Sequence, residues 1–314
     1  MQSENTKRFT KISLALLIYT LLVILWGAWV RISHSGDGCG NHWPLCQGEL
    51  IPNEQQYKTW IEYGHRLMSG AFGIIVVYIF IIGKKTFNKS HWIQKALNLS
   101  LIFTITEALL GAGLVKLGLV TSNDSPLRLI AMSLHLINSL MLVASIGLTY
   151  QLSKHELWQK KESPSFDFNS NAVNRIKTLF TPLFILICLT GAIAALSTTL
   201  FPSENLIDGL KNDFSTDSHY LLKLRGLHPL MGVFIGGLLS ISAFVLSQYA
   251  RDEDTKKQTY NLFIVILCGI IVGGSTLILL SPVFMKLIHL AMTYLIWIQL
   301  IFWIITLKAT HQKQ

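Results

Sequence analysis

Hydrophobic residues gather in eight long stretches along the chain, separated by polar segments. The stretches cover 12–31, 63–83, 96–117, 128–150, 178–200, 224–248, 260–281 and 285–307. A bilayer core about 30 Å thick needs about 20 apolar residues in helical form, because lipid offers the backbone no hydrogen-bond partners. The pattern therefore predicts an all-α, polytopic membrane protein with eight transmembrane helices.

The composition excludes an ordinary soluble protein. Of the 314 residues, 51% are hydrophobic and 14% are charged, whereas charged residues make up about 25% of a typical soluble domain. The formal net charge of +9 could suit a nucleic acid, but the basic residues lie between the apolar stretches and form no single patch. We therefore expect the lipid bilayer as a partner and no nucleic acid.

The basic residues also predict the orientation of the chain. Most of the 26 lysines and arginines lie in the two terminal tails and in the loops 84–95, 151–177 and 249–259. Lysine and arginine near the ends of spans stay on the cytoplasmic side. We expect a multi-pass protein of the cytoplasmic membrane with both termini in the cytoplasm and the other loops facing outward.

Two cysteines, Cys39 and Cys46, lie in the first outward loop, in a glycine-rich segment. Outside the cytoplasm neighbouring thiols oxidise readily, and six intervening residues let the two backbones approach to bridging distance. The loop therefore predicts a disulfide. The spacing leaves open whether the bond is a structural staple or a redox-active pair.

The two halves of the chain repeat each other. Leu25-Trp-Gly-Ala in the first span matches Leu189-Thr-Gly-Ala in the fifth, and Leu134-His-Leu in the fourth matches Ile288-His-Leu in the eighth. Four spans separate the copies, so both halves point the same way across the membrane. The repeat predicts two parallel, tandem four-helix bundles. Their predicted bounds are 1–150 for the N-terminal half, 151–177 for a cytoplasmic linker and 178–314 for the C-terminal half.

Four of the ten histidines fall inside even-numbered spans, each near the outward end: His65, His135, His228 and His289. One such histidine alone would more often be a buried hydrogen-bonding residue. As a set related by the repeat, they suit haem, which takes an imidazole on each face of its iron from two neighbouring helices. Zinc or copper would need more ligands than the spans supply. We predict two bis-histidine haem sites near the outer face, His65 with His135 and His228 with His289.

Charged residues near these histidines differ between the halves. Arg66, Arg128 and Arg225 are candidates for contacts with haem propionates, or are ordinary interfacial arginines. Three residues before the histidine, the first half has Glu62 where the second has Arg225, which predicts different tasks for the two sites. A carboxylate at Glu62 could move protons or stabilise a cationic intermediate, or it only starts a helix. Glu107, deep in the third span, suits a proton path or a buried hydrogen bond.

Because of these residues, the chain resembles the haem A synthase family of the cysteine-containing bacterial type. The motifs that carry the resemblance are Glu62-Tyr-Gly-His65-Arg66 and the outward loop Gly38-Cys39-Gly-Asn-His-Trp43-Pro44-Leu-Cys46. The resemblance extends from the first span to the eighth. It implies an oxidoreductase that converts a methyl group of haem O to a formyl group by successive hydroxylations, which gives haem A for terminal oxidases.

The resemblance also implies a division of labour between the halves. The first half, with His65 and His135, would hold haem O as substrate and haem A as product. The second half, with His228 and His289, would hold a haem b that relays electrons. Glu62 would be the catalytic carboxylate. Haem O would come from a haem O synthase and electrons from a donor that the sequence does not identify. The oligomeric state stays open, a homo-oligomer included.

Two departures from the family pattern lie in the second half. Arg225-Gly-Leu-His228-Pro229 lacks the glutamate and arginine that flank the first histidine, and its proline predicts a bend in the sixth span. The loop 201–223 is long and acidic, and the sequence suggests no function for it. The resemblance also implies a role for Cys39 and Cys46 in haem handling or reduction.

Three other functions fit parts of the sequence. A bis-histidine cytochrome for electron transfer would use all four histidines without modifying its haem, but it leaves Glu62 unexplained. A quinone-linked disulfide oxidoreductase would use Cys39 and Cys46 and leaves the histidines unexplained. A haem transporter should carry its site near the middle of the membrane rather than at one face.

Overall fold

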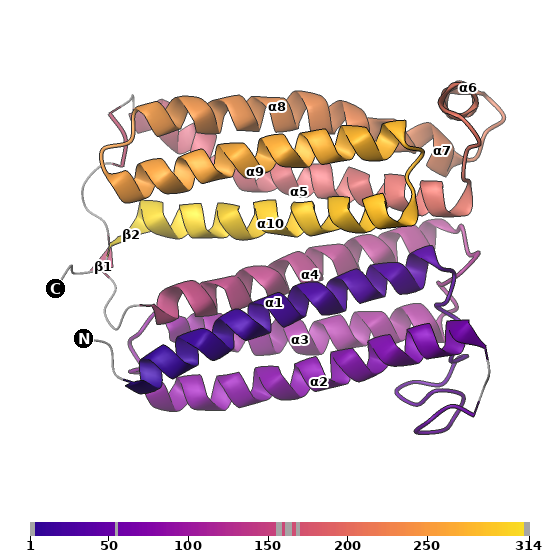
Figure 1. Ribbon diagram of the computed structural model, residues 1–314, viewed down its shortest axis with the longest axis horizontal. Helices are drawn as coiled ribbons and strands as arrows, with labels where there is room; N and C mark the ends of the chain where they lie inside the picture. Colours follow the sequence, from indigo (N-terminus) through magenta and orange to yellow (C-terminus); the bar gives the residue numbers. More distant parts are fainter. Residues whose placement is uncertain (1–3, 54–55, 155–158, 161–164, 168–169, 311–314) are drawn as a thin grey trace. The chain divides into compact units, whose positions relative to one another are not determined.

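The computed structural model describes residues 4–53, 56–154, 159–160, 165–167 and 170–310. Within these ranges eight helical segments are long and apolar enough to cross a membrane, which confirms the predicted all-α architecture (Figure 1). They are α1 (Glu4–Ile32), α2 (Tyr57–Thr86), α3 (Ile93–Lys116), α4 (Pro126–Ser153), α5 (Ser170–Leu200), the consecutive helices α7 (Tyr220–Arg225) and α8 (Leu227–Gln248), α9 (Glu253–Ile278) and α10 (Val283–Lys308).

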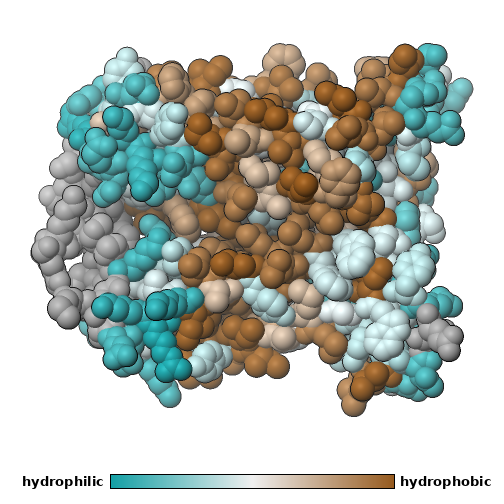
Figure 2. All heavy atoms as spheres, in the orientation of Figure 1, coloured by the Kyte–Doolittle hydropathy of each residue, from teal (hydrophilic) through white to brown (hydrophobic). Residues whose placement is uncertain are grey.

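The surface of these helices matches a lipid environment. Hydrophobic side chains cover their middle stretches, and hydrophilic side chains gather toward their ends (Figure 2). Many large apolar side chains are exposed there, among them Ile74 at 73% and Phe234 at 72%. In water such exposure would be unfavourable, so this surface is what a multi-pass membrane protein requires.

The chain divides into two compact units, and the first contains α1 to α4. Its helices form a closed up-and-down ring, in which α1 and α3 each pack against both α2 and α4. Helix α4 begins with Ser125, whose hydroxyl accepts from the backbone N–H of Arg128, and with Pro126 in the first turn. Helices α2 and α4 both start at the end of this unit where α1 and α3 finish, so His65 and His135 lie toward the same end.

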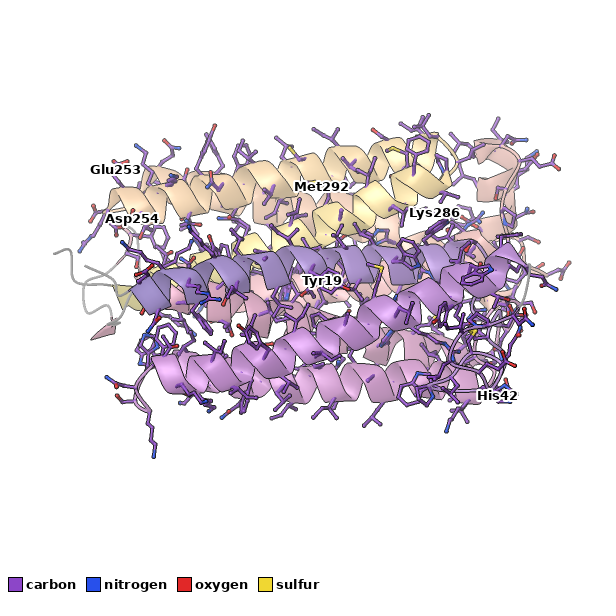
Figure 3. The ribbon with its side chains drawn as sticks, turned by 60° about the horizontal axis from the view of Figure 1, so that its bottom comes forward. Tyr19, His42, Glu253, Asp254, Lys286 and Met292 are labelled. Carbon is purple, nitrogen blue, oxygen red and sulfur yellow. A yellow bond between two sulfur atoms is a disulfide. The ribbon has the colours of Figure 1, made fainter. Side chains whose placement is uncertain are left out.

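The second unit contains α5 and α7 to α10, with α5 and α9 each packed against both α8 and α10. Aromatic pairs fill its core: the rings of Phe184 and Trp297 stack at 5.7 Å, and those of Phe180 and Trp303 lie 5.1 Å apart. Asp252 caps the start of α9. Figure 3 shows Glu253 and Asp254 at that start and Lys286 at the opposite end of this unit.

The second unit contains elements that the apolar stretches do not predict. A short helix, α6 (Leu206–Phe214), lies in the loop between α5 and α7. Strands β1 (Gln159–Lys160) and β2 (Ala309–Thr310) form a two-residue antiparallel pair. The break between α7 and α8 is at Gly226, just before Pro229. Pro229 therefore lies in the first turn of α8, where its missing N–H would have no helical partner in any case.

The bounds of the halves and the parallel relation of the two bundles stay predictions. Helix α4 continues to Ser153 and α5 begins at Ser170, so both helices enter the predicted linker. Part of that linker, residues 155–158, 161–164 and 168–169, lies outside the described residues.

Candidate functional site

The four membrane histidines meet in pairs, one pair in each unit. In the first unit, His65 on α2 and His135 on α4 are close enough to interact electrostatically. In the second, the rings of His228 on α8 and His289 on α10 have centroids 5.9 Å apart and planes inclined at 63°. This is about the spacing at which two imidazoles can reach one metal ion from opposite sides. The pairs are those that the repeat predicts.

A glycine on the neighbouring helix makes room for an imidazole in each unit. A Cβ added at Gly27 would lie 2.8 Å from Cε1 of His65, and one at Gly191 would lie 3.0 Å from Cε1 of His228. A Cβ at Gly27 would come closer than real Cβ atoms do, and one at Gly191 would be tighter than most real contacts, so the ring would have to shift in both units. Gly27 and Gly191 are the glycines of the repeated Leu-Xaa-Gly-Ala motif, and close contact with histidine is a physical reason for that repeat.

Most of the paired imidazoles have a ring nitrogen without a protein partner. Nδ1 is buried without a hydrogen-bond partner in His65, His135 and His289, within the described part of the chain. Nδ1 of His228 lies 3.2 Å from the carbonyl oxygen of Ile187. Buried nitrogens without partners are unfavourable by about 1–3 kcal/mol each. Paired neutral imidazoles with glycine beside them fit the axial ligands of a flat iron porphyrin, so these four residues could hold haem.

Glu62 links α2, which carries His65, to the loop between α1 and α2. The side chain is 3% exposed, and its Oε2 accepts a hydrogen bond of 2.8 Å from the backbone N–H of Cys39. Oε1 forms an ion pair with Arg66. Arg66 in turn donates to the carbonyl oxygens of His42 and Leu45. The carboxylate is therefore fixed in place by partners on two sides.

The predicted disulfide is present between Cys39 and Cys46, whose Cα atoms lie 4.4 Å apart. Both residues are almost fully buried. The backbone of the enclosed segment closes on itself, because the N–H of Gln47 donates to the carbonyl of Cys39. The bond therefore holds the same loop that Glu62 and Arg66 contact.

We expect alkylation of the unreduced protein to leave Cys39 and Cys46 unlabelled, because both sulfurs are oxidised and buried. After reduction under denaturing conditions, two additional alkyl groups should appear in this peptide. Peptide mass spectrometry measures the difference, and the free Cys268 is the internal positive control, since it should be labelled in the denatured protein with or without reductant. Labelling of Cys39 or Cys46 without reductant would contradict the disulfide.

Arg225 performs the corresponding anchoring in the second unit. Its Nε lies 2.5 Å from a carboxylate oxygen of Asp213, and its Nη2 donates to the carbonyl of Gly209 and to Oγ of Ser203. Burial raises the pKa of Asp213, and the adjacent guanidinium offsets part of this rise. The position three residues before the histidine thus holds a neighbouring loop in each unit, with opposite charge. The contacts of Arg225 account for part of the loop 201–223.

The third predicted arginine, Arg128, is also held by the protein. It is 2% exposed, and its Nη1 donates to the carbonyl oxygens of Thr121, at 2.7 Å, and Asn123. Arg66, Arg128 and Arg225 each have protein partners, so contacts between these side chains and propionates stay predictions.

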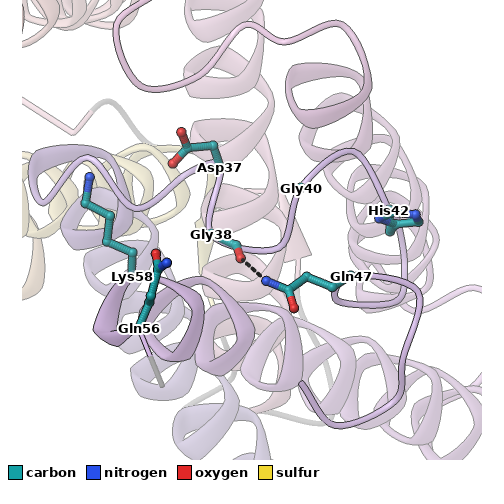
Figure 4. Close-up of a pocket in the computed structure, with 7 residues that line it drawn as sticks. All are labelled: Asp37, Gly38, Gly40, His42, Gln47, Gln56 and Lys58. Atoms are coloured by element: carbon teal, nitrogen blue, oxygen red, sulfur yellow. Dashed lines mark hydrogen bonds between the residues drawn. The ribbon is translucent and has the colours of Figure 1, made fainter. Parts of the chain in front are cut away.

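A cavity of about 350 Å³ lies in the disulfide loop (Figure 4). The side-chain amide of Gln47 donates to the carbonyl of Gly38 across it, at 3.3 Å. None of the four membrane histidines lines it. Its lining residues are Asp37, Gly38, Gly40, His42, Gln47, Gln56 and Lys58.

Fold and site together define a class: a polytopic helical membrane protein with a pair of partly buried histidines in each of two units. Comparison with known proteins specifies the family. Residues 10–301 match the family described as "Cytochrome oxidase assembly protein" (COX15-CtaA), and the chain belongs to this family. The predicted resemblance is thereby confirmed.

Individual relatives match the chain over different lengths. It is 31% identical over 302 residues to "Protoheme IX farnesyltransferase" of a Thermus thermophilus strain, which covers 96% of this chain and 49% of that protein. It is 41% identical over 98 residues to "Heme A synthase" of a Bacillus cereus strain, covering 31% of this chain and 32% of that protein. The chain spans about half the length of the Thermus relative.

Proposed function

We propose that this protein is a haem A synthase, which oxidises a methyl group of haem O to a formyl group and so supplies haem A to terminal oxidases. One observation carries the proposal: each unit has a partly buried histidine pair, but three residues before its first histidine the first unit has a fixed carboxylate, Glu62, and the second has Arg225. Two equal electron-transfer sites would not need this difference. Membership of the cytochrome oxidase assembly family supports the same function.

In this proposal His65 and His135 bind the substrate haem O and the product haem A. His228 and His289 bind a haem b that relays electrons. The bound iron supplies the redox chemistry that amino-acid side chains lack. The protein contributes the imidazoles and uses glycines such as Gly27 to leave space for the rings.

Glu62 is the proposed catalytic residue. Arg66 and the Cys39 N–H fix its carboxylate near the outer end of α2, on the face that also carries His65. A fixed negative charge stabilises positive charge that develops at the porphyrin methyl carbon, and a carboxylate can also accept the proton that leaves it. No residue of the second unit described above offers this combination, since Arg225 takes the corresponding position.

We also propose that both termini are cytoplasmic and that the histidine pairs lie near the outer face. Lys84 and Lys85 occupy the last turn of α2, at the opposite end of that helix from His65. Basic residues at that end support a cytoplasmic location for it. Haem O would reach the outer site from an enzyme that attaches the farnesyl group, and the electron donor would be a separate component.

The Thermus relatives are named as farnesyltransferases, so farnesyl transfer is the alternative reaction to test. Those proteins are about twice as long as the matched region, so their name does not decide which reaction the matched half performs. Farnesyl transfer would convert haem b to haem O, whereas the proposed reaction converts haem O to haem A. Extracted pigments separate the two.

We expect haem A to form when this chain is produced in cells that contain a separate haem O source, and not when the chain is omitted. Acidified solvent extraction followed by chromatography and mass spectrometry measures haem b, haem O and haem A. Cells without the haem O source are the matched control and should contain haem b alone. Unchanged haem O would indicate a simple cytochrome, and new haem O in the control cells would indicate farnesyl transfer.

A further inference from the structure

A polar cluster between α3 and α4 ends at one of the paired histidines. Oε1 of Glu107 lies 3.4 Å from Nδ1 of His135. Oε2 of the same carboxyl group accepts from Nδ2 of Asn138 at 2.6 Å. Oγ1 of Thr106 lies 2.6 Å from Oδ1 of Asn138. The cluster consists of these four residues and lies in the apolar part of the first unit.

The chemistry of the groups fixes which atom donates and which accepts in each hydrogen bond of the cluster. Nδ2 of Asn138 also donates to the carbonyl oxygen of Phe103 at 2.9 Å. Since a carbonyl oxygen only accepts, the amide nitrogen must face Phe103 and Glu107, and the amide oxygen must face Thr106. The hydroxyl of Thr106 therefore donates to Asn138, and Asn138 donates to Glu107. Oε1 of Glu107 is left facing the imidazole.

The second unit has a different set of residues at the same register. Gly111 on α3 is the glycine nearest His135, and Gly273 on α9 is the one nearest His289. Four residues before these glycines stand Glu107 in the first unit and Gly269 in the second. Three residues after the histidines stand Asn138 and Met292, the latter on α10 in Figure 3. The carboxylate and its amide partner therefore belong to the first unit alone.

A histidine that binds a metal ion through Nε2 carries its proton on Nδ1, and that N–H needs an acceptor. Nδ1 of His135 has no hydrogen-bond partner within the described part of the chain, and Oε1 of Glu107 is slightly beyond the usual bonding distance. A small rotation of the ring would close the gap. An imidazole that donates to a carboxylate is more basic and favours ferric over ferrous iron.

We propose that Glu107 is a positioning residue for His135, and that it accepts the Nδ1 proton so that Nε2 faces the iron of the substrate haem. This rests on the proposed function, in which His65 and His135 bind that haem. Asn138 and Thr106 hold the carboxylate in place. The first site then has a carboxyl oxygen behind one ligand, whereas in the second His228 faces the backbone carbonyl of Ile187.

The test uses the full chain carrying His289→Ala, which removes one ligand of the second pair, so that the remaining haem is that of the first. In this background we compare Glu107, Glu107→Gln and Glu107→Leu by spectroelectrochemical titration and by electron paramagnetic resonance of the ferric state. Glu107→Leu should increase the ferrous-to-ferric ratio at a given applied potential about tenfold. For a one-electron couple this is a rise of ~59 mV in the reduction potential. Glu107→Gln keeps an acceptor oxygen without charge and should give a smaller rise.

Ser100→Ala is the matched control, because Ser100 on α3 contacts Ser145 on α4 at 3.1 Å without touching His135. It should leave the potential and the ferric spectrum unchanged. An unchanged potential in both Glu107 variants with haem still bound overturns the proposal, as does an equal shift in Ser100→Ala. If Glu107→Leu does not retain haem, the reduction potential of Glu107→Gln alone tests the proposal. Absence of haem from the background with Glu107 intact would contradict the proposed haem site and not the role of Glu107.

Discussion

Glu62→Gln is expected to keep haem in both units and to slow the formation of haem A about 100- to 1,000-fold, the usual effect of losing one stabilising group at a developing charge. Glutamine has almost the same shape and can still accept from the Cys39 N–H through its amide oxygen. It lacks the negative charge that would stabilise the reacting carbon and cannot accept a proton at ordinary pH. Binding should therefore survive while conversion is lost.

Soret absorbance and the haem-to-protein ratio measure binding, and the proportion of haem A among extracted pigments measures conversion. Asp213→Asn is the matched control, because it makes the same carboxylate-to-amide change beside the anchoring residue of the other unit. It should lower haem A formation far less than Glu62→Gln does, because Asp213 holds a loop of the second unit and does not lie beside the first histidine pair. A colourless Glu62→Gln protein would mean that Glu62 serves the outer loop and not the reaction.

The eight helices could be predicted because an apolar stretch of about 20 residues is sufficient evidence for a spanning helix. The residues at which these helices begin and end could not be predicted. Helix α1 begins at Glu4 and α2 at Tyr57, eight and six residues before the apolar stretches at 12–31 and 63–83. Hydrophobicity marks the part of a helix that lies in lipid, whereas the helix continues through polar residues as long as its hydrogen bonds are made.

The short helix α6 did have a sequence signal. Asn205 caps its start by accepting from the backbone N–H of Asp208, and Ile207, Leu210 and Phe214 follow at helical spacing. All three apolar side chains are more than half exposed. The acidic composition of the loop conceals this pattern, because charge alone is more typical of an irregular segment.

The histidine pairs could be predicted because ionisable residues in apolar helices are rare and the repeat relates them. The contacts around the histidines could not be predicted. Gly111 and Gly273 serve the later histidines, but their flanking residues have diverged between the halves, so no repeat marks them. The contact of Glu107 with His135 depends on how α3 and α4 are rotated against each other, and a single sequence contains no direct record of that rotation.

Gly27→Leu is expected to remove the haem of the first unit and with it about half of the bound haem and all haem A formation. Even a methyl group at this position would lie 2.8 Å from Cε1 and 3.1 Å from Nε2 of His65. Overpacking of this kind typically forces shifts worth about 1–3 kcal/mol, and a displaced imidazole can no longer reach iron shared with His135. The second unit has its own glycine, Gly191, so its haem should remain.

Gly70→Leu is the matched control, because Gly70 lies on α2 in the same unit and a Cβ there would meet nothing within 4 Å. It adds the same side chain to a membrane helix and should leave haem content and haem A formation unchanged. Gly191→Leu should give the converse result, with loss of haem b and retention of the substrate haem. If Gly27→Leu retained all haem, the imidazole of His65 would not be an iron ligand, because a residue that displaces the ring cannot leave its bond to iron intact.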